Sequence, residues 1–236
     1  MMESSNIEKR LHDIEARLNR DEHSQNKLAN MSPLGLFAFA ITTANLQVRH
    51  MLDASDAATG IAVGAAFGFG GLIQLIAGLF NATRGQTFGG VAFCSYGGFW
   101  LSFAVHECLV RTYVFPRNDV AESSMLFMWG IFTTALFTCS FNTNIAVSTL
   151  FASLAMLFYL LGAAKNADSE ALEVFTAIVG FITSIIAFYA GLGELMNDLY
   201  GKTLIPIGAF EHTHHGVDRS FNEPRKPRIP LDSIPR

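Results

Sequence analysis

The chain has 236 residues, of which 50% are hydrophobic and only 15% are charged, and its formal net charge is −4. An ordinary soluble domain has about 25% charged residues, whereas the stretches 127–141 and 145–164 here contain none. The charges fall almost wholly in the two ends of the chain and in short connections. This composition excludes a soluble globular protein and predicts a protein that lives in a membrane.

Residues 1–29 are expected to form a polar cytoplasmic tail that contains a short amphipathic helix. Ile7, Leu11, Ile14 and Leu18 recur at helical spacing and give this tail one apolar stripe. Such a stripe fits a helix that lies on the membrane surface or on its own bundle. It also fits a short coiled-coil seam between subunits.

Residues 30–208 are predicted to form one transmembrane domain, because they contain six apolar segments of nearly bilayer length. A hydrocarbon core about 30 Å thick needs roughly 20 apolar residues per helix. The expected spans are 33–51, 57–80, 87–110, 124–141, 145–164 and 172–197. The fold class is therefore an all-α polytopic membrane protein with six transmembrane helices per subunit. Residues 209–236 are polar and proline-containing, which predicts a disordered cytoplasmic tail.

The Lys and Arg residues are distributed unevenly between the two expected sides of the membrane. Twelve lie in the two tails and in the second connection, and four lie on the other side. Cytoplasmic segments carry an excess of Lys and Arg. We therefore expect an integral protein of the plasma membrane with both termini in the cytoplasm, which requires an even number of spans.

A row of glycines marks the second expected helix. Gly60, Gly64 and Gly68 recur at four-residue spacing, and such rows let helix backbones approach closely in lipid. The row therefore predicts tight helix packing within one subunit or between subunits, and it favours a homo-oligomer.

The sequence contains no HExxH, GxSxG or phosphate-binding loop motif. We therefore expect a protein that is not an enzyme, with no catalytic residues, no cofactor, no bound metal and no nucleic acid partner. Its function is to be sought in what can pass through or along a helix bundle.

The apolar spans contain scattered neutral polar residues, among them Asn45, Gln74 and Thr133. An unpaired amide in hydrocarbon costs on the order of a few kcal/mol, so such groups turn inward. They either hydrogen-bond between helices or line a pore for a small polar solute. Glu194 is one of few acids near membrane depth, and it either reaches the interface or pairs with a group at the pore mouth.

Several motifs occur in the order and at the spacing of a known family. Residues 30–36 (NMSPLGL) open the first expected helix, 95–101 (SYGGFWL) lie in the third, and 201–208 (GKTLIPIG) follow the sixth. Further matching stretches are 71–78, 87–89, 129–133 and 193–197. Together these motifs resemble the acetate uptake transporters, also called succinate–acetate permeases.

The resemblance implies a homohexameric ring with a pore in each subunit. It implies transport of small carboxylate anions, acetate and in some members succinate, with free anion flow and coupling to protons both open. It also implies a narrow constriction formed by Phe39, Tyr96 and Leu154. There the phenol of Tyr96 is expected to offer a hydrogen bond to a passing carboxylate.

Three residues depart from the family pattern. Met31 stands where the signature has its first proline, Ser32 where it has alanine, and Asn81 where an acid often follows the second helix. The matching constriction residues favour transport of short monocarboxylates. The alternatives are a non-transporting sensor or structural oligomer that keeps the fold, and a channel for another small solute.

The start of the first helix offers a further hypothesis. The signature consists of Asn30, Pro33, Leu34, Gly35 and Leu36. A proline in the first turn loses no hydrogen bond, and Asn30 or Ser32 can cap that turn. Because the N–H groups of a helix N-terminus attract carboxylates, this start is either an anion site at the cytoplasmic mouth or an ordinary capped helix end.

Overall fold

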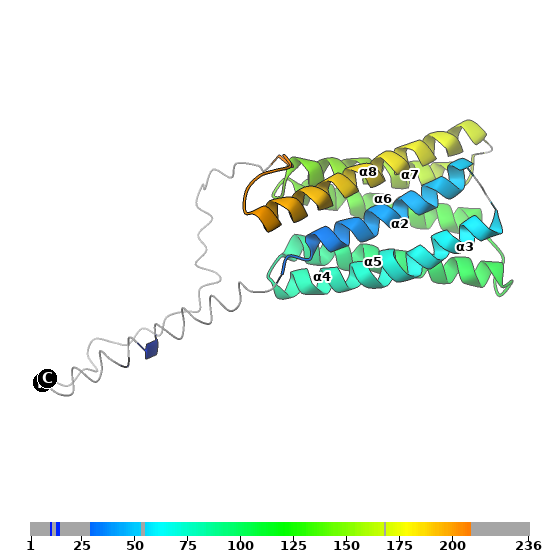
Figure 1. Cartoon of the computed structure of the whole chain (residues 1–236). Coiled ribbons are helices and arrows are strands. Elements are labelled where there is room, and N and C mark those ends of the chain that lie inside the picture. The colour runs from blue at the N-terminus through cyan, green and yellow to red at the C-terminus, as the bar shows by residue number, and fades with distance from the viewer. Residues whose placement is uncertain (1–9, 11–12, 15–28, 53–54, 168, 209–236) are drawn as a thin grey trace, which may run out of the picture.

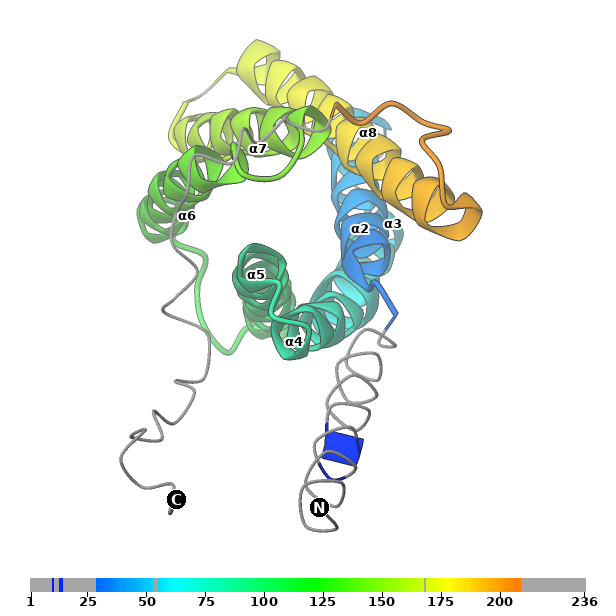
Figure 2. The ribbon, with the colours of Figure 1, turned by 90° about the vertical axis from the view of Figure 1, so that its left-hand side faces the viewer.

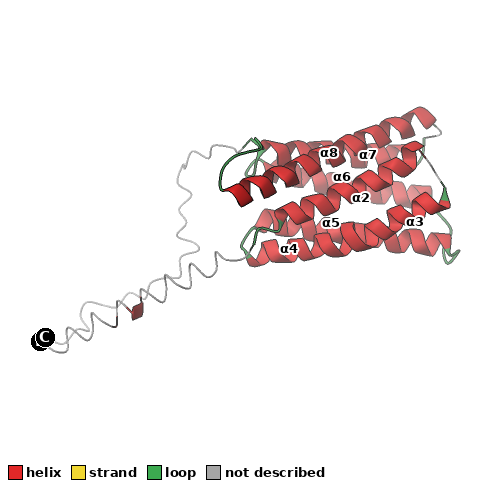
Figure 3. Ribbon diagram, in the orientation of Figure 1, coloured by secondary structure: helices red, strands yellow, loops and turns green. Residues whose placement is uncertain are grey.

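The computed structural model describes residues 10, 13–14, 29–52, 55–167 and 169–208. In this part of the chain the elements are helices, which form six rods in one bundle (Figure 1; Figure 3). The rods are α2 (Ser32–Leu52), a second rod made of α3 (Asp56–Ala65), η1 (Ala66–Ile73) and α4 (Gln74–Thr83), then α5 (Thr87–Arg111), α6 (Asp119–Ser140), α7 (Ile145–Ala164) and α8 (Glu170–Tyr200). The six predicted helices are thus confirmed as helices. The predicted tail 209–236 lies outside the described residues, as does the apolar stripe of the first tail except for the exposed Ile14.

The helices are arranged in a ring, as the end-on view in Figure 2 shows. The first and last helices, α2 and α8, pack against each other, although they are far apart in the sequence. From α8 the ring continues through α7 to α6, and from α2 it continues through the second rod to α5. The backbones of α5 and α6 approach each other at few points, so large side chains between them complete the ring, such as Phe99 and Trp129 with ring centroids 5.1 Å apart.

The bundle is apolar outside and polar inside, the reverse of a soluble protein. Ile61, Met128 and Ile131 expose 64–71% of their surface. Gln47 and Thr183, in contrast, are 1% and 0% exposed. A surface of this kind fits hydrocarbon, where polar groups must find partners inside the protein.

Five of the rods are long and apolar enough to cross a membrane; among the described residues they are Ala57–Thr83, Thr87–Arg111, Asp119–Ser140, Ile145–Ala164 and Glu170–Tyr200. The first helix, α2, is not one of the five. Its inner face carries Thr42, Thr43 and Gln47, all buried, and these polar residues lower its mean hydropathy. Its 21 residues still give it a length of about 31 Å.

The second rod is a single helix, as predicted, but its middle is wound as a π-helix over Ala66–Ile73. Gly70 and Gly71 lie in this segment and are buried. A side chain on Gly70 would meet Thr42 of α2 at 2.7 Å, and one on Gly71 would meet Leu101 of α5 at 2.6 Å. The widened turn therefore lies where the second rod closely approaches both α2 and α5. The hydropathy pattern of the sequence does not predict such a turn.

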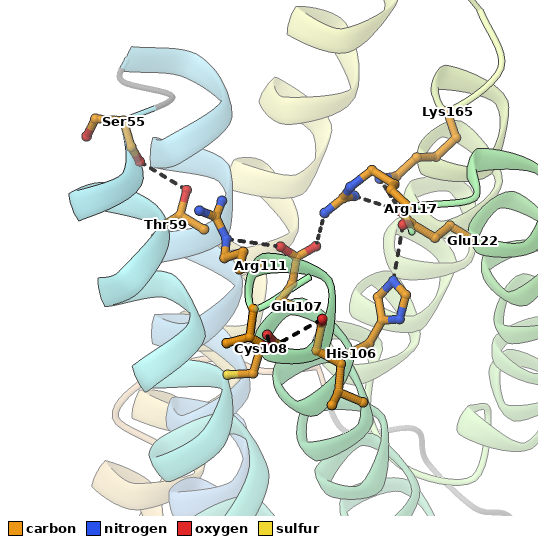
Figure 4. Close-up of polar contacts among 11 residues, drawn as sticks. Ser55, Thr59, His106, Glu107, Cys108, Arg111, Arg117, Glu122 and Lys165 are labelled. Carbon is orange, nitrogen blue, oxygen red and sulfur yellow. Dashed lines mark hydrogen bonds and ion pairs between the residues drawn. The ribbon is translucent and has the colours of Figure 1, made fainter. Parts of the chain in front are cut away.

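An ion-pair network closes the end of the bundle that carries the α5–α6 and α7–α8 loops, called here the far end (Figure 4). The guanidinium of Arg117 binds the carboxylates of Glu107 at 2.7 Å and Glu122 at 3.0 Å. Glu122 also binds Lys165 at 2.5 Å and His106 at 3.1 Å. The two acids are only 3% and 8% exposed, so the network holds the α5–α6 loop onto α5, α6 and α7.

A short segment at the opposite end, residues 201–208, folds back over the bundle and is called here the strap. It begins at Gly201, whose φ of +63° ends α8. The side-chain oxygen of Asn197 accepts from the N–H groups of Leu204 at 2.7 Å and Ile205 at 3.0 Å. The carbonyl of Gly208 then accepts from the Ile145 N–H at 2.7 Å. The strap thereby satisfies a free donor at the start of α7.

A close helix crossing joins α4 to α5. A Cβ atom added to Gly78 would lie 2.6 Å from the backbone nitrogen of Cys94, and one added to Gly97 would lie 2.8 Å from that of Leu75. Backbone cannot yield as a flexible side chain can, so both positions require glycine. Gly64 differs, since nothing lies within 4 Å of its added Cβ atom.

Replacing Gly78 by alanine should therefore force α4 and α5 apart. We expect a loss of about 1–3 kcal/mol in the free energy of unfolding, as for other overpacked cores. Thermal unfolding of the purified protein in mild detergent measures this as a lower melting temperature. Gly98→Ala is the matched control, because a Cβ atom added to Gly98 meets nothing within 4 Å. Equal melting temperatures for the two variants would contradict the crossing described here.

Candidate functional site

A central cavity of about 620 Å³ extends into the bundle from the end that carries the strap, called here the mouth end. Residues from α2, α4, α5, α7 and α8 line it, together with residues of the connections at that end. Because a water molecule occupies about 30 Å³ in the liquid, the cavity has room for roughly 20 of them. It can therefore hold a small organic solute with part of its hydration shell.

The part of the cavity near the mouth end is polar. Its polar lining residues are Asn30, Ser32, Gln86, Thr87, Asn142, Thr143, Glu194, Asn197 and Asp198. Among the described residues that line the cavity, the charged types are Glu194 and Asp198, and both are acids. Glu194 is half-buried and hydrogen-bonds to Asn144, the residue that caps α7. Glu194 thus lies at the mouth of the cavity and has a partner there.

The deep part of the cavity is apolar and aromatic. Phe39, Tyr96 and Leu154 line it, and they are 4%, 2% and 3% exposed. The Phe39 and Tyr96 ring centroids lie 6.0 Å apart in an edge-on arrangement. The structure thus brings all three residues of the predicted constriction, from α2, α5 and α7, to one cavity.

Gln74 is a polar exception in the cavity lining. It begins α4, directly after the π-helical segment, and is 1% exposed. Its side-chain oxygen is buried and has no hydrogen-bond partner. A buried amide with an open acceptor can bind a solute that donates a hydrogen bond.

The hydroxyl of Tyr96 already has a partner in the protein. It lies 2.9 Å from the hydroxyl of Thr133 on α6. The ring packs among other aromatic rings, including those of Trp129 and Phe158, with centroids 5.9 Å and 6.4 Å away. The hydrogen bond that we expected Tyr96 to offer a passing carboxylate would therefore have to compete with Thr133.

Two of the predicted polar lining residues do not line this cavity. Thr133 is fully buried behind Tyr96, and Asn45 is half-buried farther along α2. Helical periodicity can show that a residue faces inward, but it cannot show whether a larger side chain stands between that residue and the cavity.

The signature motif forms the start of α2 at the mouth. The side-chain oxygen of Asn30 accepts from the N–H of Ser32 at 3.1 Å, and both residues line the cavity together with Leu36. Pro33 is the second residue of the helix. Gly35 is required because a Cβ atom there would meet the ring of Phe93 at 2.8 Å.

Two of the departures from the family pattern contact each other. The side-chain amide of Asn81 donates to the hydroxyl of Ser32 at 2.9 Å, and Asn81 is fully buried. The two changes therefore form one polar contact between α2 and α4 at the cavity mouth.

Sequence reasoning missed most of the polar mouth, including Gln86, Asn142, Thr143, Asn197 and Asp198. These residues lie in connections or in the last turns of α8. These residues could have been found from the sequence, because alternate connections of an antiparallel bundle lie at the same end. The polar residues of those connections are therefore expected to lie near one another.

Comparison with known proteins agrees with this architecture. A family model described as the GPR1/FUN34/yaaH family matches residues 15–207. The succinate-acetate/proton symporter SatP of Escherichia coli strain K12 is 34% identical over 189 residues, 77% of this chain and 96% of that protein. Acetate permease A of Emericella nidulans is 34% identical over 209 residues, 82% of this chain and 70% of that protein.

A solved structure, that of the bacterial acetate channel SatP, is similar with a TM-score of 0.73 and 34% sequence identity. The match covers 77% of this chain and 100% of that chain. Its extent, the apolar outer surface and the five candidate spans identify an integral membrane protein. The chain therefore belongs to the GPR1/FUN34/yaaH family of acetate uptake transporters, which are transporters and channels and not enzymes.

Proposed function

We propose that this protein conducts small carboxylic acids across a membrane through its central cavity, with acetate and other short monocarboxylates foremost and the dicarboxylate succinate as the larger candidate. The observation that carries the proposal is a cavity with a polar mouth and a closed aromatic floor. The names of its relatives, which refer to acetate and succinate, support the same substrate class.

The gate of this path is formed by Phe39, Tyr96 and Leu154. Their buried side chains line the deep end of the cavity, and their apolar surfaces hinder a continuous column of water. Beyond the gate the path continues through a trail of buried polar atoms without hydrogen-bond partners, on Thr43, Trp100 and Gln47. It ends in a second cavity of about 330 Å³ at the far end, which Gln47 also lines.

All six rods cross the membrane in this proposal, α2 included. Its length suits a bilayer core, and its polar residues face the bundle. The start of α2 and the strap, which follows α8, lie at the same end of the bundle (Figure 1), as an even number of crossings requires. The excess of Lys and Arg in both tails supports a cytoplasmic position for this end.

The protein works as a ring-shaped homo-oligomer, most simply a hexamer. The glycine row on the second rod supports this, because added Cβ atoms at Gly60, Gly64 and Gly68 meet nothing within 4 Å. The row is therefore not used for packing inside the subunit. Its remaining role is close packing against a neighbouring subunit.

The first test of the proposal addresses the gate. Leu154→Ala and Phe39→Ala should both widen it, so uptake of succinate or lactate should rise relative to acetate. Tyr96→Phe is the matched control, since it keeps the ring and should leave the size preference unchanged. Uptake of labelled acids by purified protein in liposomes measures the ratios. Wild-type ratios in both alanine variants, with normal folding, would place the constriction elsewhere.

The second test addresses assembly. Gly64→Leu should weaken the oligomer, since a branched side chain blocks the approach of a neighbouring backbone. Native mass spectrometry in mild detergent should show smaller assemblies than for the wild type, while the melting temperature of the subunit stays unchanged. Wild-type protein that is monomeric under these conditions would refute the oligomer.

The third test addresses orientation. Single cysteines placed at Ser5 and Ser220, in a variant without Cys94, Cys108 and Cys139, should both be protected from an impermeant thiol reagent in intact cells. Both should react after the membrane is opened. Labelling of either cysteine in intact cells would reverse or break the proposed topology.

A further inference from the structure

We infer that Thr133 is a positioning residue that accepts the hydrogen bond of the Tyr96 hydroxyl, so that the gate admits the neutral carboxylic acid and not its anion. The carboxyl proton of the acid then crosses the gate together with the acid, and no proton relay in the protein is needed. This inference rests on the proposed function and specifies the form of the substrate.

The direction of two hydrogen bonds carries the argument. The Thr133 hydroxyl lies 2.7 Å from the carbonyl oxygen of Trp129, one turn earlier in α6. A carbonyl oxygen cannot donate, so the single proton of Thr133 is used there. In its contact with Tyr96, at 2.9 Å, Thr133 can therefore only accept. The Tyr96 hydroxyl therefore donates its only proton in the hydrogen bond to Thr133, and it has no second proton to donate to a carboxylate.

The aromatic rings around the gate offer a carboxylate no hydrogen bond. The Tyr96 ring is enclosed by those of Phe39, Phe151 and Phe158, with centroids 6.0–6.4 Å away. The faces of aromatic rings carry partial negative charge and do not favour an anion. Moving an unpaired carboxylate into such a site is far more costly than moving a neutral acid.

The charged residues of the cavity also favour a neutral acid over an anion. No Lys, Arg or His stands among the described residues that line it, and its two charged types are the acids Glu194 and Asp198. An anion entering from the mouth end would meet two carboxylates before it reached the gate. A neutral acid is not repelled by them.

The one amide near the gate is complementary to a neutral acid. Gln74 offers one acceptor and one donor group, whichever way its amide is turned. A protonated carboxyl group has the same pair, so the two can bind reciprocally. A carboxylate would leave the buried oxygen of Gln74 facing a second acceptor.

The decisive measurement is the charge that crosses with each acetate. In liposomes with equal pH on both sides, a potassium gradient and valinomycin impose 100 mV, positive inside. For an anion this potential favours accumulation by about 50-fold at equilibrium, so the initial rate of protein-dependent uptake would rise. For a neutral acid the rate should not change. Protein-free liposomes give the background.

Variants at position 133 test the role of the threonine. Thr133→Val and Thr133→Ala remove the acceptor of the Tyr96 O–H group, which can then donate to a carboxylate. Uptake should therefore gain an anionic component that rises with the imposed potential. Thr133→Ser keeps an acceptor and should behave as the wild type. Thr134→Val is the matched control, because Thr134 makes the same two bonds, to the Gly130 carbonyl at 2.8 Å and the Tyr159 hydroxyl at 3.1 Å, on the exposed side of α6.

Each outcome decides a separate claim. Wild-type uptake that rises several-fold with the potential would overturn the neutral-acid gate while leaving transport intact. Insensitivity to the potential in the wild type and in both the valine and alanine variants would support the gate but remove Thr133 from it. Absence of protein-dependent uptake under either a potential or a pH gradient would refute the proposed function, and the inference with it.

Discussion

The surrounding hydrocarbon supplies no hydrogen bonds, and the rest of this structure follows from that constraint. Thr134, Thr176 and Thr183 each donate their hydroxyl proton to the carbonyl four residues earlier, so these side chains satisfy themselves within one helix. Polar atoms left without such a partner gather in the interior, where Gln74, Thr43 and Gln47 lie. In the proposed path, these unsatisfied groups are the ones that a polar solute would meet.

The same constraint explains how much could be predicted from the sequence. The six helices were predictable because an apolar run of bilayer length has few alternatives. The predicted constriction residues depended on motif resemblance, since hydropathy alone does not distinguish Phe39 or Leu154 from any other core residue. The contact between Ser32 and Asn81 was not predictable, because it joins positions 49 residues apart through one hydrogen bond.

Hydrogen-bond direction is equally absent from the sequence. A buried tyrosine beside a cavity suggests a donor for a carboxylate, and that was the expectation for Tyr96. The structure adds a third group, the Trp129 carbonyl, which fixes the proton of Thr133 and through it that of Tyr96. The Trp129 carbonyl oxygen thereby decides whether the proposed gate can donate a hydrogen bond to a solute. The sequence does not show that Trp129, Thr133 and Tyr96 are linked in this way.

The π-helical segment of the second rod resolves a conflict between the two faces of one helix. In an unbroken α-helix of 3.6 residues per turn, Gly64 and Gly78 would lie within about 40° of the same side. Yet Gly64 faces open space and Gly78 packs against the backbone of α5. In the wider winding of Ala66–Ile73, each residue turns through a smaller angle about the helix axis than in an α-helix. The residues after this segment therefore face a different side than they would in an unbroken α-helix. The first half of the rod can therefore present glycines to the outside, while the second half turns its own glycine and Gln74 inward. If the same residues were wound as an unbroken α-helix, Gly64 and Gly78 would turn to nearly the same side, and at least one of them would lose its present surroundings.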